Sequence, residues 1–173
     1  ILLTGIGGGT TKAITDQISA MGTKLITVNT NRRGSTRSVD YDDLSEYVED
    51  NPKLFSNLCP YISGFAQAKL GSENFQTSLD ASNEQYESIK NVELINGRFI
   101  SEYDCENRAY VVVVGTYIQK ELFGGMNPVG ESIKLNGKQF KIIGVYDETA
   151  DSTKNSQDNK VTIPYTTAMR FLK

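Results

Sequence analysis

Two stretches of the sequence carry residue types that could take part in chemistry. The first is GIGGGTTK at residues 5–12, whose glycines and lysine are typical of phosphate-binding loops. A P-loop, however, needs glycine immediately before its lysine, and position 11 is threonine. A dinucleotide-binding fingerprint needs glycine or alanine at position 10, which is also threonine. Because no strand is predicted before this stretch, we expect a glycine-rich junction between helices rather than a nucleotide site.

The second stretch is a dense run of carboxylates between residues 40 and 50. Paired carboxylates act as general acid and base where a cleft raises the pKa of one partner. Here the run follows a helical pattern in which Leu44, Tyr47 and Val48 form an apolar stripe. We therefore predict a solvated helix face rather than a catalytic pair. Its acidic residues are Asp40, Asp42, Asp43, Glu46, Glu49 and Asp50.

Other catalytic and metal-binding residues are scarce. The chain has no histidine, which is the commonest general base and metal ligand near neutral pH. Its two cysteines, Cys59 and Cys105, form no CxxC motif, which argues against a zinc site, and their spacing leaves a disulfide between them open. A serine nucleophile would need a lysine base, and no S-x-x-K sequence is present. We expect no catalytic, cofactor-binding or metal-binding residue in this chain.

Composition and chain ends narrow the class of protein. The 173 residues are 38% hydrophobic and 23% charged, as in a globular domain. A net charge of −3, with no basic cluster beyond Arg32, Arg33 and Arg37, argues against nucleic-acid binding. No apolar run reaches the length of about twenty residues needed to span a bilayer. Because the chain starts on ILLTGI without methionine and stops within an amphipathic pattern, we expect a domain cut from between two transmembrane helices.

The pattern between residues 110 and 146 predicts a strand, a helix and a hairpin in succession. Val111 to Val114 is a β-branched run that fits a central strand buried on both faces. The spacing of Thr116 and Gln119 predicts a capping box at the start of the helix. Asn136-Gly137 predicts a hairpin turn, because both residues accept positive φ. The alternating apolar residues of this hairpin are Ile133, Leu135, Phe140 and Ile142.

Weaker patterns predict the remaining elements. Asp147 to Asn159 has a single apolar residue and is predicted to be a surface loop or a long hairpin tip. Two strand–helix–strand units, near 24–65 and 109–145, predict an α+β fold in which both units share a sheet. The other predicted elements are helices over 10–21, over 83–89 and after Asp40, strands over 24–29, 54–65, 75–79 and 161–164, a polar loop over 30–38 and a turn at Asn96-Gly97.

Several motifs occur in a fixed order along the chain. NGRFISEYD at 96–104 is followed by LFG, NPVG and IIGV between 122 and 145, and VTIPYTTA at 161–168 closes the series. Together with the glycine-rich start and TTKAITDQISAMGTKLITVN at 10–29, they resemble the extracytoplasmic domain of MacB-type ABC transporter permeases. That family also includes lipoprotein-releasing and FtsX-like proteins.

The resemblance implies an architecture and a set of partners. The expected α+β fold is a porter-like domain in two halves, 1–65 and 109–173, with a smaller sabre-like insertion at 66–108. The domain would lie on the extracytoplasmic side of the cell membrane, between the first two of four transmembrane helices. The permease would work as a homodimer, with ATP and magnesium bound at a separate ABC ATPase domain or subunit. An accessory or membrane-fusion adaptor protein is a further expected partner.

Three hypotheses of function follow. The first is a permease domain that conveys ATP-driven motion of membrane helices to export of an antimicrobial peptide, macrolide or lipoprotein. The second is a stand-alone secreted binding or adhesion module, which explains the lack of catalytic residues equally well. The third is a hydrolase that uses the acidic helix, for which Asp42→Asn or Asp43→Asn would abolish turnover. Apolar spans of about twenty residues on both sides of 1–173 would favour the first, and a signal peptide alone the second.

Overall fold

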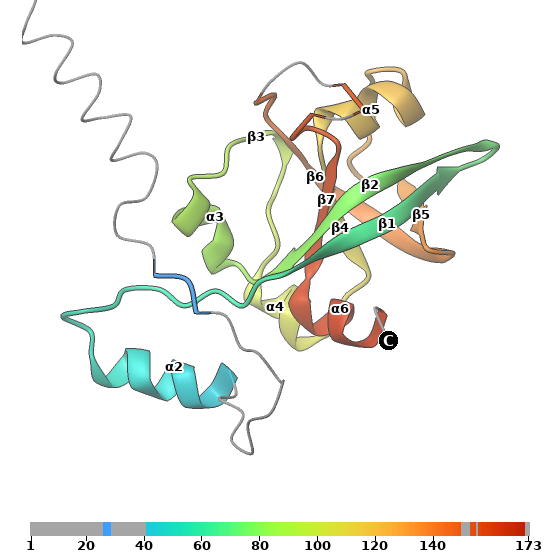
Figure 1. The fold of residues 1–173 in the computed structure, drawn as a ribbon. Coiled ribbons are helices and arrows are strands. Elements are labelled where there is room, and N and C mark those ends of the chain that lie inside the picture. Colours follow the sequence, from blue (N-terminus) through green and yellow to red (C-terminus); the bar gives the residue numbers. More distant parts are fainter. Residues whose placement is uncertain (1–25, 29–40, 150–152, 155, 172–173) are drawn as a thin grey trace, which may run out of the picture.

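The computed structural model describes residues 26–28, 41–149, 153–154 and 156–171, which form five helices and seven strands (Figure 1). The helices are α2 (Tyr41–Asp50), α3 (Gln85–Lys90), α4 (Glu102–Glu106), α5 (Thr116–Phe123) and α6 (Tyr165–Phe171). The strands are β1 (Ile62–Leu70), β2 (Glu73–Ser82), β3 (Leu94–Gly97), β4 (Val111–Val114), β5 (Ser132–Leu135), β6 (Lys138–Tyr146) and β7 (Lys160–Pro164). No helix among the described residues is both long and apolar enough to cross a membrane.

The sheet closes on itself. Its strand order is β3-β6-β4-β7-β2-β1-β5, and β5 pairs in addition with β6, so that the first and last strands of the barrel meet. The pairs β4–β6 and β2–β7 are parallel, and the others are antiparallel. Closure gives most strands a partner on both sides, which stabilises a small sheet that would otherwise expose edges.

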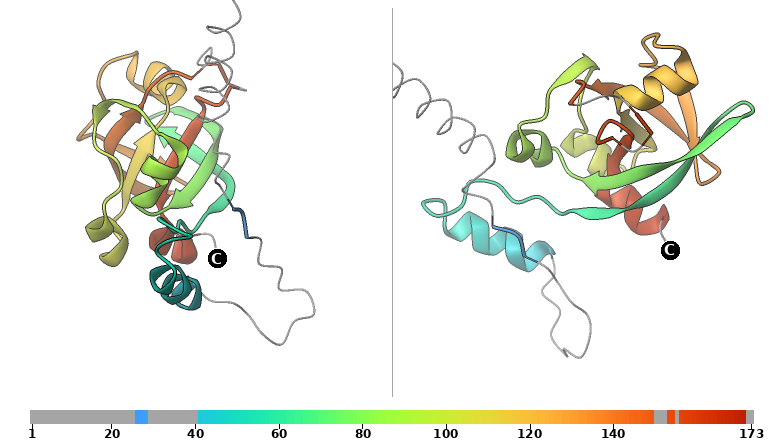
Figure 2. Two further views of the ribbon diagram at one scale, coloured as in Figure 1. Left: turned by 90° about the vertical axis from the view of Figure 1, so that its left-hand side faces the viewer. Right: turned by 45° about the horizontal axis from the view of Figure 1, so that its top comes forward.

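Apolar side chains fill the inside of the barrel. Val112 and Val114 of β4 belong to this inner cluster, while Val113, between them, belongs to a second cluster on the outer face. All three valines are fully buried, which confirms the prediction of a strand buried on both faces. Figures 1 and 2 show α5 at one end of the barrel and α6 at the other. Ile118 of α5 and Ala168 of α6 complete the inner cluster.

The predicted hairpin between β5 and β6 is confirmed. Asn136 and Gly137 have φ values of 45° and 83°, as the turn requires. Leu135 pairs with Lys138 directly across the turn. The four alternating apolar residues of the hairpin are all inside the barrel, because this register turns every second side chain inward.

The capping box predicted at the start of α5 is wrong. The N-cap is Gly115, and no side chain caps the helix there. A Cβ at position 115 would overlap the carbonyl oxygen of Asp158, which accepts a hydrogen bond from the Tyr117 amide at 3.3 Å. The backbone of a segment distant in sequence therefore caps α5. Gln119 instead donates to the carbonyl oxygens that follow the helix.

The turn predicted at Asn96-Gly97 is also wrong. These residues end β3, where Asn96 pairs with Val145 and Gly97 with Gly144 beside a bulge. Gly97 has a φ of 78°, and a Cβ there would overlap the backbone of Ile143. The positive φ of Gly97 thus serves a close approach between two strands.

Two expectations near the ends of the fold need correction. Over 24–29, only Ile26 to Val28 are described, and they form no strand because they pair with none of the seven. Ile26 is 70% exposed and Val28 is 61% exposed. At the far end of the predicted surface loop, Asp158 and Asn159 are buried against the barrel. The predictions over 5–12, 10–21 and 30–38, and that for Asp40, lie outside the described residues.

The remaining predictions concern whole units. The second strand–helix–strand unit is present, because β4 and β6 are parallel neighbours joined through α5. The described residues show no first unit, because the segment over 54–65 becomes a strand only at Ile62. The helix after Asp40, the helix over 83–89 and the strands over 75–79 and 161–164 are present as α2, α3, β2 and β7. The division into 1–65, 66–108 and 109–173 stays a prediction, and the sheet runs across both boundaries.

Gly144→Ala tests the close approach between β3 and β6. An added Cβ would overlap the carbonyl oxygen of Arg98, and neither backbone can move aside without breaking the β3–β6 ladder. We expect the free energy of unfolding to fall by about 2–3 kcal/mol, as for overpacked cores. Urea unfolding measures the change.

Gly64→Ala is the matched control within β1. A Cβ at position 64 meets nothing within 4 Å, so stability should stay the same or rise slightly. Equal losses in the two variants would contradict the account of the β3–β6 approach.

Candidate functional site

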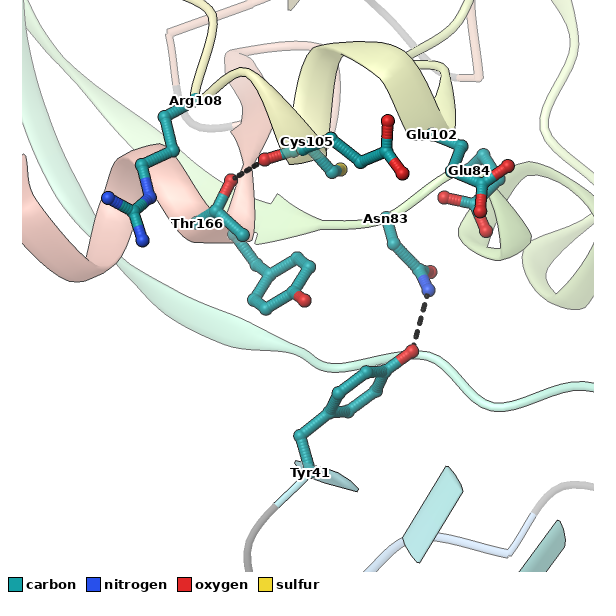
Figure 3. A pocket seen from close by; sticks show the side chains of 9 residues that line it. Tyr41, Asn83, Glu84, Glu102, Cys105, Arg108 and Thr166 are labelled. Carbon is teal, nitrogen blue, oxygen red and sulfur yellow. Dashed lines mark hydrogen bonds between the residues drawn. The ribbon is translucent and has the colours of Figure 1, made fainter. Parts of the chain in front are cut away.

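A pocket of about 260 Å³ lies where α2 meets the barrel (Figure 3). Its walls come from the first residues of α2 and α6, from α4 and from the residues before α3. Three carboxylates line it, those of Glu84, Glu102 and Glu106. Figures 1 and 2 show α2 and α6 together at this end of the barrel. The pocket therefore marks a joint between segments from opposite ends of the described chain.

Two tyrosines form the centre of this joint. The rings of Tyr41, the first residue of α2, and Tyr165, the first residue of α6, have centroids 5.6 Å apart at an angle of 45°. Asn83 donates to the Tyr41 hydroxyl at 3.4 Å and to the carbonyl oxygen of Leu58 at 3.2 Å. Partial burial raises the pKa of both tyrosines, so both stay neutral at physiological pH. No residue of α2 is fully buried, so the contacts of Tyr41 are important for holding this helix against the barrel.

The start of α6 is fixed to the region around α4. Thr166 donates its hydroxyl hydrogen to the carbonyl oxygen of Cys105 at 2.6 Å, and Thr167 donates to that of Ala109 at 3.0 Å. Thr167 is fully buried, so its hydrogen bond is shielded from water. These two threonines belong to the closing VTIPYTTA motif, whose polar residues thus serve packing.

The segment from α2 to β1 is attached to the same wall. Ser82 donates to the carbonyl oxygen of Pro60 at 2.9 Å. Tyr61 stacks on Tyr86 of α3 with centroids 6.0 Å apart, and its hydroxyl donates to Asp80 at 2.7 Å. A movement of this segment would therefore strain contacts to both β2 and α3.

Both cysteines are free thiols, on two sides of Ser82. The sulfur of Cys59 lies 2.7 Å from the Ser82 hydroxyl oxygen, and the Cys105 thiol donates to the Ser82 carbonyl oxygen at 3.8 Å. Burial raises the pKa of the Cys59 thiol, and it raises that of Cys105 to about 12. Since the thiolate is the nucleophile, both groups are poor nucleophiles at neutral pH.

The NGRFISEYD motif forms a clamp next to the pocket. Arg98 donates to both carboxylate oxygens of Asp104, at 2.6 and 3.1 Å, and to the carbonyl oxygen of Phe99 at 2.8 Å. Ser101 and Asp104 form a capping box at the start of α4. Burial alone would raise the pKa of Asp104, but the hydrogen bonds from Arg98 and Ser101 outweigh it and hold that pKa below its usual value. The motif thus fixes α4 against β3.

The residues singled out in the sequence are not brought together here. GIGGGTTK at 5–12 and Asp40 lie outside the described residues. The other carboxylates of the acidic helix, from Asp42 to Asp50, are exposed on α2. Among the described residues, no three side chains of His, Cys, Asp or Glu are placed to hold a metal ion. The joint between Tyr41 and Tyr165 could not be found from the sequence, because no local pattern links positions so far apart.

Known proteins resemble this chain over nearly its whole length. A family model for the MacB-like periplasmic core domain matches residues 1–173. The chain belongs to this family. The macrolide export ATP-binding/permease protein MacB of Bdellovibrio bacteriovorus is 30% identical over 176 residues, covering 95% of this chain and 26% of that protein. The pyoverdine export ATP-binding/permease protein PvdT of Pseudomonas aeruginosa is 26% identical, covering 97% of this chain and 26% of its own length.

A solved structure of the same family supports the fold. The crystal structure of the periplasmic region of MacB from Actinobacillus actinomycetemcomitans superposes with a TM-score of 0.69 at 25% identity. The match covers 91% of this chain and 72% of that one. The α+β fold expected of a MacB-like periplasmic core domain is therefore confirmed. This chain spans about a quarter of the length of the curated relatives it matches.

Asp104→Asn tests the clamp through its dependence on pH. Because the folded-state pKa of Asp104 is lowered, the charged carboxylate stabilises the fold above about pH 4, and this contribution is lost as pH falls through the folded pKa. At pH 7 we expect the free energy of unfolding to fall by about 1–2 kcal/mol. The effect is modest because Arg98 is half exposed, so water screens its attraction to Asp104. Urea unfolding of wild type and variant should converge as pH drops below about 4.

Glu102→Gln, on the exposed side of the same helix, is the control. Because Glu102 is exposed and makes none of the clamp's hydrogen bonds, its replacement should cost far less stability than that of Asp104. A constant gap between wild type and Asp104→Asn from pH 7 to pH 3 would show that the charge of Asp104 contributes nothing.

Proposed function

We propose that this chain is the extracytoplasmic domain of an ABC transporter permease and transmits force rather than catalysing a reaction. In this proposal, ATP-driven movement of membrane helices reaches the barrel through the segments at its ends. The barrel then passes the movement to cargo or to a partner outside the membrane. Membership of the MacB-like periplasmic core domain family supports the proposal.

The observation that carries the proposal is the contact between Tyr41 and Tyr165. It joins the helix on the amino-terminal side of the barrel to the last helix of the chain. Hydrogen bonds from Thr166 and Thr167 then hold that last helix to α4 and to the loop that leads into β4. Force entering through either segment would thus reach one closed sheet, whose paired strands resist relative sliding.

The same proposal assigns the energy source and the partners to other parts of the transporter. Relatives named ATP-binding/permease proteins support an ATPase domain or subunit, where ATP and magnesium would bind. A second permease protomer would complete a homodimer, and an accessory or membrane-fusion adaptor protein is a further partner. The division into halves at 1–65 and 109–173 around an insertion at 66–108 belongs to this proposal as well.

The names of the relatives indicate more than one class of cargo. One is named for macrolide export and another for pyoverdine export, so similar domains serve chemically different cargo. We keep antimicrobial peptides, macrolides and lipoproteins as the proposed classes. A stand-alone secreted module is not favoured, because the family match covers the whole chain.

Tyr41→Ala and Tyr165→Ala in the full-length protein test the role of the joint. Each variant removes the ring contact far from any site of ATP hydrolysis. We expect ATP hydrolysis to continue while export falls about tenfold, a coupling typical of linked sites. ATP hydrolysis by the purified protein and cellular resistance to a macrolide and to an antimicrobial peptide are the two measurements.

Tyr47→Ala is the matched control on the same helix. Tyr47 is 56% exposed, and its ring packs against Phe55 rather than against the barrel or α6, so its loss should leave both ATP hydrolysis and resistance unchanged. Full resistance in Tyr41→Ala and Tyr165→Ala, with both proteins present at normal levels, would contradict transmission through this joint.

A further inference from the structure

A second concave surface lies on the side of the barrel, away from the tyrosine joint. It is a groove of about 350 Å³ between the β1–β2 turn and β5. Lys69 and Lys134 lie on its walls together with Gln139, and Leu70 contributes apolar surface. We call this surface the lysine groove.

Strand register sets the lysines beside one another. Lys69 of β1 pairs directly with Lys134 of β5, and Lys141 of β6 pairs with Ser132 of the same β5. All three lysines are exposed, while the residues on either side of Lys134 and of Lys141 belong to the inner cluster. Three cations therefore cross the outer face on adjacent strands, which are about 4.8 Å apart.

This arrangement costs stability, and none of these lysines forms an ion pair with a carboxylate of the described residues. Like charges directly opposite one another on paired strands are destabilising. Within the described part of the chain, the ion pairs are Arg98–Asp104 and Lys120–Glu148, and neither includes a lysine of the groove. The groove carries positive charge although the whole chain has a net charge of −3. Such a cluster is expected where an anionic partner supplies the missing charge.

The shape of the groove indicates the class of partner. A concave surface with apolar and hydrogen-bonding walls suits an inserted chain better than a flat membrane. In an extended chain, side chains at alternate positions lie about 7 Å apart on one face, which the flexible stems of lysines on adjacent strands can follow. Carboxylates at alternate positions would thus meet the lysines while the peptide backbone meets Ser132 and Gln139.

We propose that the lysine groove binds an acidic segment of a partner protein. Neither the groove nor its charge depends on the transport function proposed above. Its test can therefore fail while the transport proposal stands, and the reverse also holds.

The test measures binding of fluorescein-labelled hexaglutamate to the full-length protein by fluorescence anisotropy, without nucleotide. Hexaglutamine is the uncharged comparison. The double variant Lys69→Gln/Lys134→Gln should bind hexaglutamate about tenfold more weakly than wild type, because two charge pairs are lost. Lys53→Gln, which changes an exposed lysine outside the groove, should bind as wild type does. Binding should weaken as salt is added.

Two further measurements keep the proposal open to refutation. Lys69→Arg/Lys134→Arg retains the charge and should retain binding, which separates a lost site from a lost fold. Equal binding of hexaglutamate by wild type and the Gln double variant would overturn the proposal, as would equal binding of hexaglutamine. Displacement of hexaglutamate by inorganic phosphate, but not by sodium chloride of equal ionic strength, would assign the groove to phosphate groups and would also overturn it.

Discussion

The position of β6 in the sheet is the constraint on which the rest of the structure depends. Its nine residues pair with β4 along one edge and with both β5 and β3 along the other. The pairing with β5 closes the barrel, and the pairing with β3 brings the NGRFISEYD motif to the outer face. A single strand thus connects the inner core, the outer core and the clamp that fixes α4.

Glycines allow backbone segments to approach closely at two places in the fold. At Gly144 the backbone of β6 meets that of Arg98, and at Gly115 the start of α5 meets Asp158. In both places the neighbouring atoms belong to the backbone, so no side chain can rotate away to make room. The glycine of the IIGV motif and the glycine that follows β4 are therefore explained by backbone packing.

Sequence patterns predicted what depends on neighbours along the chain. The β-branched run at Val111–Val114 and the turn at Asn136-Gly137 are local in this sense, and the structure confirms both. Thr116 and Gln119 match a capping box equally well, yet the carbonyl oxygen of Asp158 takes that role, and only the folded barrel brings it there. At the candidate site, the pattern of α2 predicted its exposed acidic face but not the ring contact made by its first residue.

The chemistry of the joint fits a mechanical role. Its thiols and tyrosine hydroxyls are held in their neutral forms by burial, and hydrogen bonds from Asn83, Thr166 and Thr167 reach backbone carbonyl groups. Such groups hold two surfaces together without providing a nucleophile paired to a base. Under the proposed function, what matters is that the tyrosine contact and the closed sheet move as one body.

Distances between spin labels in the full-length protein test that claim most directly. Labels at Glu49→Cys on α2 and Glu121→Cys on α5, in a background of Cys59→Ser and Cys105→Ser, report on the two ends of one domain. With ATP bound or absent, the account predicts one unchanged distance within the domain and a changed distance between equivalent labels on two protomers. A distance within the domain that shifts with ATP would contradict the account, because the barrel and α2 would then move separately.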